Sequence, residues 1–255
     1  AASRDGGAGG RVRTELAALA GVIAFALATM IVYRVTGARA SSADLTGRGG
    51  SFVMGFWVRN WFYWLIRPVT RASIAIGLTP LFYNLFAVAC GLASMVAYAT
   101  DHFPMAGLFI FVSGIADVMD GEVARGTQTA DARGAFLDST LDRFTEFAAF
   151  AGLAFAFSSG WISVAIVVAL GGSLLVSYTR ARGESLGVLC KVGLMQRAER
   201  MIFLGLGSIL DPGVCAASGW TPGSLVAGVV AVIAAGTVWT SVYRTIWIAR
   251  ALRGR

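Results

Sequence analysis

The chain has 255 residues, of which 56% are hydrophobic and 14% are charged. A soluble domain has roughly 45–50% apolar and about 25% charged residues, so this composition excludes the soluble enzyme classes and indicates a helical membrane protein with several spans. The net charge is +7, and the basic residues gather between the apolar segments, which favours phosphate-bearing ligands at a membrane surface over nucleic acid.

The first fifty residues divide into three parts. Residues 1–15 are rich in Ala, Gly, Ser and Arg and are predicted to be disordered. Residues 16–36 contain an apolar run that spans or nearly spans a bilayer, and they are predicted to form an accessory transmembrane helix. Residues 37–50 read as a linker. From residue 51 to residue 255 the sequence predicts one all-α membrane domain.

Residues 51–71 are predicted to form an amphipathic helix that lies in the headgroup region. Indole rings and guanidinium groups both prefer this region. Here the two kinds of side chain are interleaved, as Trp57, Arg59, Trp61, Trp64, Arg67 and Arg71. Pro68 should end or kink the helix, because proline lacks a backbone N–H and its ring clashes with the preceding turn. The alternative, a short buried helix of the core, is disfavoured by so many Trp and Arg side chains.

Six further apolar segments are predicted to form a bundle of six transmembrane helices. They lie near residues 80–99, 104–125, 134–156, 160–182, 195–211 and 222–247. Basic residues stand before the first segment and after the second, fourth and sixth, whereas the connections near 101–102, 158–160 and 211–213 contain no Lys or Arg. The positive-inside rule therefore puts both ends of the bundle in the cytoplasm. We expect an integral protein of a prokaryotic-type cytoplasmic membrane.

Four aspartates stand near the cytoplasmic ends of the second and third segments. Helical spacing places Asp117, Asp120, Gly121 and Ala124 on one face, and it places Gly134, Asp138 and Asp142 on one face of the next helix. A turn between the helices would bring the two acidic faces together. One alternative is a set of buried Asp–Arg pairs with Arg125 and Arg143 as partners, but two arginines cannot neutralise four aspartates.

Converging carboxylates in an apolar setting repel one another unless a cation lies among them. Oxygen ligands alone suit Mg²⁺, Mn²⁺ or Ca²⁺ and do not suit zinc, and the chain has a single histidine. Carboxylate-bound Mg²⁺ typically acts on phosphates. The acidic faces therefore predict a divalent-metal site for a phosphate-bearing substrate.

The spacing of this stretch resembles the motif of the CDP-alcohol phosphatidyltransferases, Asp-x2-Asp-Gly-x2-Ala-Arg-x8-Gly-x3-Asp-x3-Asp. The fixed positions are Asp117, Asp120, Gly121, Ala124, Arg125, Gly134, Asp138 and Asp142. The resemblance covers roughly residues 55–247. It implies a CDP-linked donor, usually CDP-diacylglycerol, an active site open to the cytoplasm and to the lipid, and commonly a homodimer.

The resemblance also implies roles for these residues. The metal ligands, for one or two Mg²⁺ or Mn²⁺ ions, would be Asp117, Asp120, Asp138 and Asp142, and Asp142 would also be the general base for the acceptor hydroxyl. The donor would be bound by Asp117, Gly121, Ala124, Arg125 and Gly134. One stretch departs from the family pattern, because Leu81 and Asn84 stand where Asn and Thr are usual.

The acceptor region is similar to that of the phosphatidylinositol-phosphate and archaetidylinositol-phosphate synthases. Those proteins have Ser-Tyr-x-Lys-Ala-Arg-Ala-Glu followed by Glu-Arg-x-Glu-Arg, which bind the phosphate of inositol phosphate. The matching positions here are Ser177, Arg180, Arg200 and, more loosely, Arg244. Arg180 replaces the usual Lys. The alternative for this basic cluster is ordinary positive-inside anchoring.

The sequence therefore predicts a metal-dependent transfer of a phosphatidyl group from CDP-diacylglycerol or a similar CDP-lipid to a small alcohol, with release of CMP. An inositol phosphate is the preferred acceptor, followed by glycerol 3-phosphate and then serine or another alcohol. Two alternatives come from other classes. They are a cation or proton transporter that uses the aspartates as its ion site, and an inactive lipid-binding scaffold.

Overall fold

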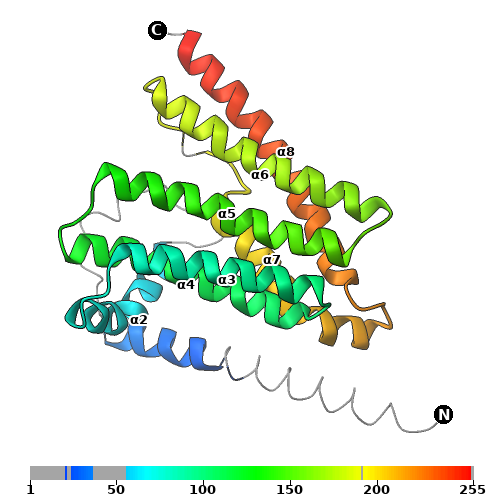
Figure 1. Ribbon diagram of the computed structural model, residues 1–255, viewed down its shortest axis with the longest axis horizontal. Coiled ribbons are helices and arrows are strands. Elements are labelled where there is room, and N and C mark those ends of the chain that lie inside the picture. The colour runs from blue at the N-terminus through cyan, green and yellow to red at the C-terminus, as the bar shows by residue number, and fades with distance from the viewer. Residues whose placement is uncertain (1–20, 22–23, 37–55, 191, 254–255) are drawn as a thin grey trace.

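The computed structural model describes residues 21, 24–36, 56–190 and 192–253 (Figure 1). The described residues form helices and turns with no strand among them, which confirms the all-α fold class. A short helix, Ala24–Val35, is followed by α2 (Phe56–Ala75), α3 (Pro80–Ala99), α4 (Phe103–Gly126), α5 (Ala132–Ala156), α6 (Trp161–Ser185), α7 (Arg197–Ser218) and α8 (Ser224–Arg253). The predicted disordered residues 1–15 and linker 37–50 lie outside the described residues.

Five helices, α3, α4, α6, α7 and α8, are long and apolar enough to cross a membrane, so the protein is an integral membrane protein. Helix α5 has 25 residues, which is the length of a span, but it carries the acidic face and is more charged than these five. The described part of the first helix, Ala24–Val35, is shorter than the about 20 residues that a span needs. The predicted count of six spans and an accessory one therefore stays a prediction.

The packing of neighbouring helices connects α3 to α8 into one bundle. Helix α3 packs against both α4 and α5, α4 packs against α7, and α8 packs against α7 and α6. Figure 1 shows α3, α4 and α5 running side by side, with α2 near the end at which α4 leads into α5. That end also holds the end of α6, the start of α7 and the end of α8. The aspartate stretch is therefore at the end that carries the basic residues.

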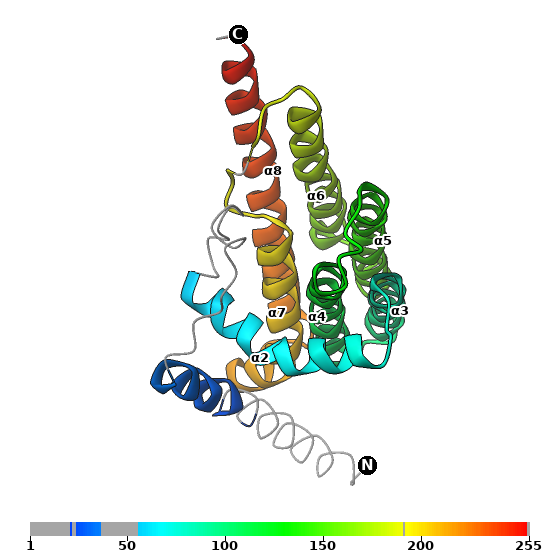
Figure 2. The same ribbon diagram turned by 90° about the vertical axis from the view of Figure 1, so that its left-hand side faces the viewer.

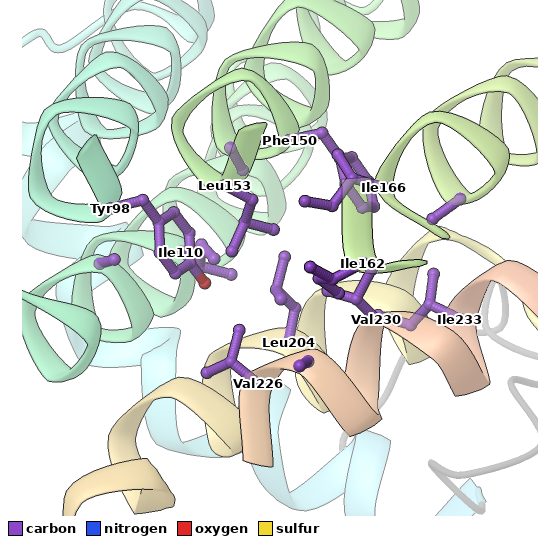
Figure 3. Close-up of a cluster of buried hydrophobic side chains, with 14 of the residues drawn as sticks. Tyr98, Ile110, Phe150, Leu153, Ile162, Ile166, Leu204, Val226, Val230 and Ile233 are labelled. Carbon is purple, nitrogen blue, oxygen red and sulfur yellow. The ribbon is translucent and has the colours of Figure 1, made fainter. Parts of the chain in front are cut away.

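Apolar side chains from six helices fill the centre of the bundle (Figure 3). The buried members labelled there are Tyr98, Ile110, Phe150, Leu153, Ile162, Ile166, Leu204, Val226, Val230 and Ile233. The Tyr98 hydroxyl lies 2.6 Å from the Ser208 hydroxyl, so the one polar atom of this tyrosine has a partner inside the core. The core ties α7 and α8 to the α3–α5 group.

Helices α3 and α5 approach closely, and a glycine on each helix permits this contact. A Cβ atom at Gly152 would lie 2.5 Å from the Met95 carbonyl oxygen, and one at Gly91 would lie 2.8 Å from the Thr145 side chain. Neither distance is possible without moving a helix. The small residues therefore set the position of α5, and with it the position of the acidic face that α5 carries.

Helix α2 is longer than predicted at its C-terminal end and continues through Pro68. Figure 2 shows it as two arms that meet at an angle, so the chain bends within the helix and the helix does not end there. Residues 51–55 of the predicted interfacial helix lie outside the described residues. One arm packs through Ile66 against Met119 and Val123 of α4, next to the aspartates.

The tryptophans of α2 also bind the helix Ala24–Val35. The Tyr33 ring lies 5.9 Å from the Trp57 ring and 5.6 Å from the Trp64 ring, measured between centroids. The Trp61 indole N–H donates to the Thr29 hydroxyl at 3.2 Å. The three indoles therefore serve as a docking face for a helix of the chain itself, a role that the amphipathic pattern does not predict.

The predicted connection at residues 211–213 is wrong, because α7 continues through Pro212 to Ser218. Asp211 is fully buried, and its carboxylate accepts the backbone N–H groups of Gly223 at 2.7 Å, Leu225 at 3.0 Å and Val226 at 3.2 Å. These N–H groups lie at the start of α8, where helical amides lack partners within the helix. Asp211 is therefore a cap that α7 supplies to α8.

Replacement of Asp211 by Asn should destabilise the α7–α8 pair, because it removes the charge that offsets the start of α8. We expect a loss of about 1–2 kcal/mol, seen as a drop of a few degrees in the Tm of the protein in detergent. Asp101→Asn is the control, because Asp101 is exposed in the α3–α4 turn at the same end of the bundle. Equal Tm values for the two variants would contradict the capping role.

Candidate active site

Helices α4 and α5 bring three of the four predicted acidic ligands together. Carboxylate oxygens of Asp117, Asp138 and Asp142 all lie within 4.8 Å of one another, and all three side chains are half-buried. Asp117 lies in the second half of α4, and Asp138 and Asp142 lie one turn apart on α5. The α4–α5 turn ends at Asp131, whose carboxylate caps α5 by accepting the Gly134 N–H at 2.7 Å.

Asp120 lies deeper than the group of three, with 5% of its surface exposed. Its carboxylate accepts the backbone N–H of Gly121, and the Asn84 side chain of α3 lies near it. Asn84 is one of the two positions at which the sequence departs from the family pattern. The structure thus gives this residue a place against an aspartate of the motif, which the sequence did not predict.

Arg197, the first residue of α7, lies between the acidic faces of α4 and α5. Its Nη1 atom is 2.8 Å from Asp117 Oδ2, and its Nη2 atom is 2.7 Å from Asp142 Oδ1. The guanidinium group therefore bridges two helices. Sequence reasoning missed this residue as a site residue, because the positive-inside rule already accounts for arginines in this region and its acidic partners lie far away in the chain.

The residues present fit a divalent metal ion. The gathered side chains offer carboxylate oxygens only, which are the ligands that Mg²⁺ and Mn²⁺ prefer. Oδ1 of Asp138 is buried and has no hydrogen-bond partner among the described residues. A buried carboxylate oxygen without a donor costs free energy unless a cation or another donor meets it.

The predicted donor-binding residues lie around the same turn. The Arg125 guanidinium lies over Gly121, where an added Cβ would come 3.1 Å from its Nη1 atom, and Arg125 also forms an ion pair with Glu122. Ala124 is half-buried on α4, one turn from Gly121. Gly134 is exposed in the first turn of α5. These positions leave backbone and small side chains, with one arginine, next to the aspartates.

The four predicted acceptor residues are placed in different ways. Arg180 on α6 is about half exposed and pairs with Glu184, with 2.9 Å between Nε and Oε1. Arg244 on α8 is 2% exposed and donates to the carbonyls of Val192 at 2.6 Å and Val176 at 2.8 Å. Ser177 on α6 is half-buried. Arg180 and Arg200 both lie close enough to Arg244 to act on it electrostatically, so the basic groups are neighbours.

Arg200 is fully buried and pairs with Glu146 of α5 through both ends of its guanidinium group. Its Nε and Nη2 atoms donate to the two Glu146 carboxylate oxygens at 2.6 and 2.9 Å, and its Nη1 atom donates to the Met195 carbonyl at 3.1 Å. Glu146 thus has a structural partner that the sequence did not reveal. The ion pair holds the start of α7 against α5, one helical turn beyond Arg197.

The model of the family described as CDP-alcohol phosphatidyltransferase matches residues 75–247. This range covers most of the chain and includes all the aspartates of the motif. The chain belongs to the CDP-alcohol phosphatidyltransferase family. The assignment confirms the predicted enzyme class, a transferase of phospholipid synthesis, and leaves the alternative of a cation transporter without support.

Several curated relatives are similar to this family member. The chain is 32% identical to phosphatidylinositol phosphate synthase of Mycobacteroides abscessus over 164 residues, which are 62% of this chain and 74% of the relative. It is 39% identical to archaetidylinositol phosphate synthase of Methanothermobacter thermautotrophicus over 150 residues, which are 56% of this chain and 75% of the relative.

Solved structures of the family show the same fold. Phosphatidylinositol phosphate synthase of Mycobacterium tuberculosis with CDP-DAG bound matches with a TM-score of 0.62 and 26% identity, over 71% of this chain and 92% of that chain. The structure of that enzyme in complex with manganese and citrate matches with a TM-score of 0.64 and 24% identity, over 71% of this chain and 87% of that chain.

The Glu146–Arg200 pair yields a stability test. We expect Glu146→Gln to cost about 3–5 kcal/mol, because it leaves a buried guanidinium group without its counter-charge. Glu146→Gln combined with Arg200→Met should recover much of this loss, as measured by unfolding of the purified protein in detergent. Glu184→Gln is the control, because the half-exposed Arg180–Glu184 pair contributes about 0–1 kcal/mol. Additive losses in the double variant would contradict the pairing.

Proposed function

We propose that this enzyme transfers the phosphatidyl group of CDP-diacylglycerol, or of a similar CDP-lipid, to an inositol phosphate and releases CMP. The observation that carries the proposal is the convergence of Asp117, Asp138 and Asp142 in the spacing of the family motif. Support for the acceptor comes from the relatives, which are named for phosphatidylinositol phosphate and archaetidylinositol phosphate synthesis. Support for the donor comes from the related structure with CDP-DAG bound.

In this proposal the four aspartates of the motif hold one or two Mg²⁺ or Mn²⁺ ions. Such an ion, when bound, neutralises negative charge on the diphosphate and on the departing CMP. The ligands are Asp117, Asp120, Asp138 and Asp142. Asp120 accepts the backbone N–H of Gly121, and the Asn84 side chain lies near its carboxylate at the bottom of the site.

Asp142 is proposed as the general base. Its carboxylate accepts the proton of the acceptor hydroxyl, whose oxygen then forms a bond to the lipid-side phosphorus of the CDP-lipid. The bond between that phosphorus and the bridging oxygen breaks, and the bridging oxygen leaves as part of CMP. Asp142 suits this role because its side chain is 18% exposed, so an acceptor can reach it from the cytoplasmic end.

The donor and acceptor are proposed to enter from opposite sides of the aspartates. On the α4 side, Gly121 and Ala124 leave space for the nucleotide, and Arg125 lies ready to contact donor phosphate. On the α6 side, the acceptor phosphate would meet the positive field of Arg180, Arg200 and Arg244 and the hydroxyl of Ser177. Arg180 has the exposed guanidinium group of this set, so we propose that it makes the direct phosphate contact.

The orientation of the site follows from the distribution of basic residues. Among the turns at the far end of the bundle, residues 100–102, 157–160 and 219–223 contain no Lys or Arg. Arginines are frequent at the end that holds the aspartates. The positive-inside rule therefore supports a site that faces the cytoplasm. The homodimer that the family resemblance implies also stays a prediction.

An acceptor panel tests the proposal. Purified protein with CDP-diacylglycerol and Mn²⁺ should release CMP with an inositol phosphate and much more slowly with glycerol 3-phosphate or serine. A chelator should stop the release. Faster release with one of the other acceptors would overturn the acceptor assignment while keeping the reaction class, and no CMP release with any acceptor would overturn the reaction.

Asp142→Asn should lower CMP release by about 10²-fold or more, because an amide cannot accept the hydroxyl proton. Asp131→Asn is the matched control, since it changes an acid at the start of the same helix and keeps a side-chain oxygen for the Gly134 N–H. The control should keep the wild-type rate. Equal rates for the two variants would remove Asp142 from the mechanism.

Arg180→Gln should raise the KM for inositol phosphate about tenfold or more while changing kcat less, because one charge-assisted contact to phosphate is lost. Arg250→Gln, at an exposed position in the last turn of α8, is the comparison, and it should leave this KM near the wild-type value. The measurement is CMP release against acceptor concentration at saturating CDP-diacylglycerol. A changed kcat with constant KM would assign Arg180 a role other than acceptor binding.

A further inference from the structure

Arg197 already uses two of the carboxylates that the metal site needs. Asp117 and Asp142 belong to the group of three whose oxygens lie within 4.8 Å of one another. Arg197 donates a hydrogen bond to one oxygen of Asp117 at 2.8 Å, and it forms an ion pair with one oxygen of Asp142 at 2.7 Å. The guanidinium group therefore stands in the position of a counter-cation between α4 and α5.

The Arg197 guanidinium group and a divalent ion cannot both bind the Asp117 and Asp142 carboxylates at full strength. The two cations repel each other at such short range, and each carboxylate oxygen that donates electron density to one is less available to the other. Three aspartates and one arginine leave a net negative charge, so a divalent ion is still attracted. The balance between the two cations then sets the affinity for the metal.

Arg197 is less buried than Arg200 and makes fewer hydrogen bonds. The Arg197 side chain is 25% exposed and stands at the first position of α7, where the cap residue Gln196 makes no side-chain capping bond. Its Nε atom has no hydrogen-bond partner among the described residues. Arg200, one turn later, is fully buried and anchored to Glu146. The start of α7 is therefore held by Arg200, whereas the partners of the Arg197 guanidinium group are the two carboxylates for which a metal ion would compete.

We propose that Arg197 is a tethered counter-cation that competes with the divalent metal for Asp117 and Asp142, and that metal loading displaces its guanidinium group from them. This inference rests on the metal-dependent function proposed above. In the metal-free enzyme the arginine neutralises part of the acidic group and ties α4 to α5. It also lowers the affinity for the ion, so that occupancy of the site follows the metal concentration.

Direct measurement of metal binding tests the inference without measuring activity. The full chain is purified, stripped with a chelator, freed of the chelator and titrated with Mn²⁺, and free Mn²⁺ is followed by electron paramagnetic resonance. Arg197→Gln should bind Mn²⁺ about tenfold more tightly than the wild type, because the competing charge is gone. Arg143→Gln is the control, since Arg143 lies near Asp138 but, among the described residues, forms an ion pair with neither Asp117 nor Asp142. It should change the affinity much less.

Thermal unfolding gives a second readout. Without metal, Arg197→Gln should have a lower Tm than the wild type, and saturating Mn²⁺ should raise its Tm by more than it raises the wild-type Tm. Arg197→Lys keeps the charge but cannot reach both carboxylates as a fork, so its Mn²⁺ affinity should fall between the other two. If Arg197→Gln fails to fold, the Mn²⁺ affinity of Arg197→Lys is compared with that of the wild type instead.

The outcomes separate the inference from the proposed function. Equal or weaker Mn²⁺ binding by Arg197→Gln overturns the competition, and in the weaker case Arg197 instead holds the ligands in place. Both results leave the metal-dependent reaction standing. If neither the wild type nor the variants bind Mn²⁺, the proposed metal-dependent function fails first, and the inference fails with it.

Discussion

Negative charge concentrated at one end of an apolar helix bundle must be balanced, and the arrangement of the other polar groups follows from this constraint. Asp117, Asp138 and Asp142 converge where α4 leads into α5. Arg197 of α7 pairs with Asp117 and Asp142, and the Gly121 N–H donates to Asp120. The close α3–α5 packing at Gly91 and Gly152 fixes how deep the acids lie. A catalytic site of this kind is possible because the same carboxylates that cost folding energy would attract a metal ion, and the nearby arginines attract phosphates.

Two arginines three residues apart on α7 illustrate how position decides the role of a side chain. Arg200 is fully buried, satisfied by Glu146 and a carbonyl, and fixes one helix against another. Arg197 is partly exposed and meets carboxylates that are expected to bind other cations. Burial with complete hydrogen bonding makes a structural group, whereas partial exposure between competing partners makes a group that can exchange them.

Much of the fold was predictable because long apolar runs bounded by polar turns define membrane helices well. The segments predicted at 80–99 and 134–156 agree with α3 and α5 within two residues. The end of α7 was missed, because Asp211-Pro212-Gly213 has the composition of a turn, and only the contact with α8 shows why an acid is tolerated there. The convergence of the acidic faces followed from helical spacing. The partners of Arg197 and Arg200 did not, since they lie 80 and 54 positions away and no local pattern marks them.

The Asp211 cap has a consequence for how the chain is inserted. An acid buried at the far end of a bundle would usually be matched by a lysine or arginine, which would weaken the charge asymmetry that orients membrane helices. Here the compensation comes from the backbone amides of α8, so the turns at that end carry no basic side chain. The backbone amides thus stabilise the contact between the last two helices, and the difference in basic residues between the two ends of the bundle is kept.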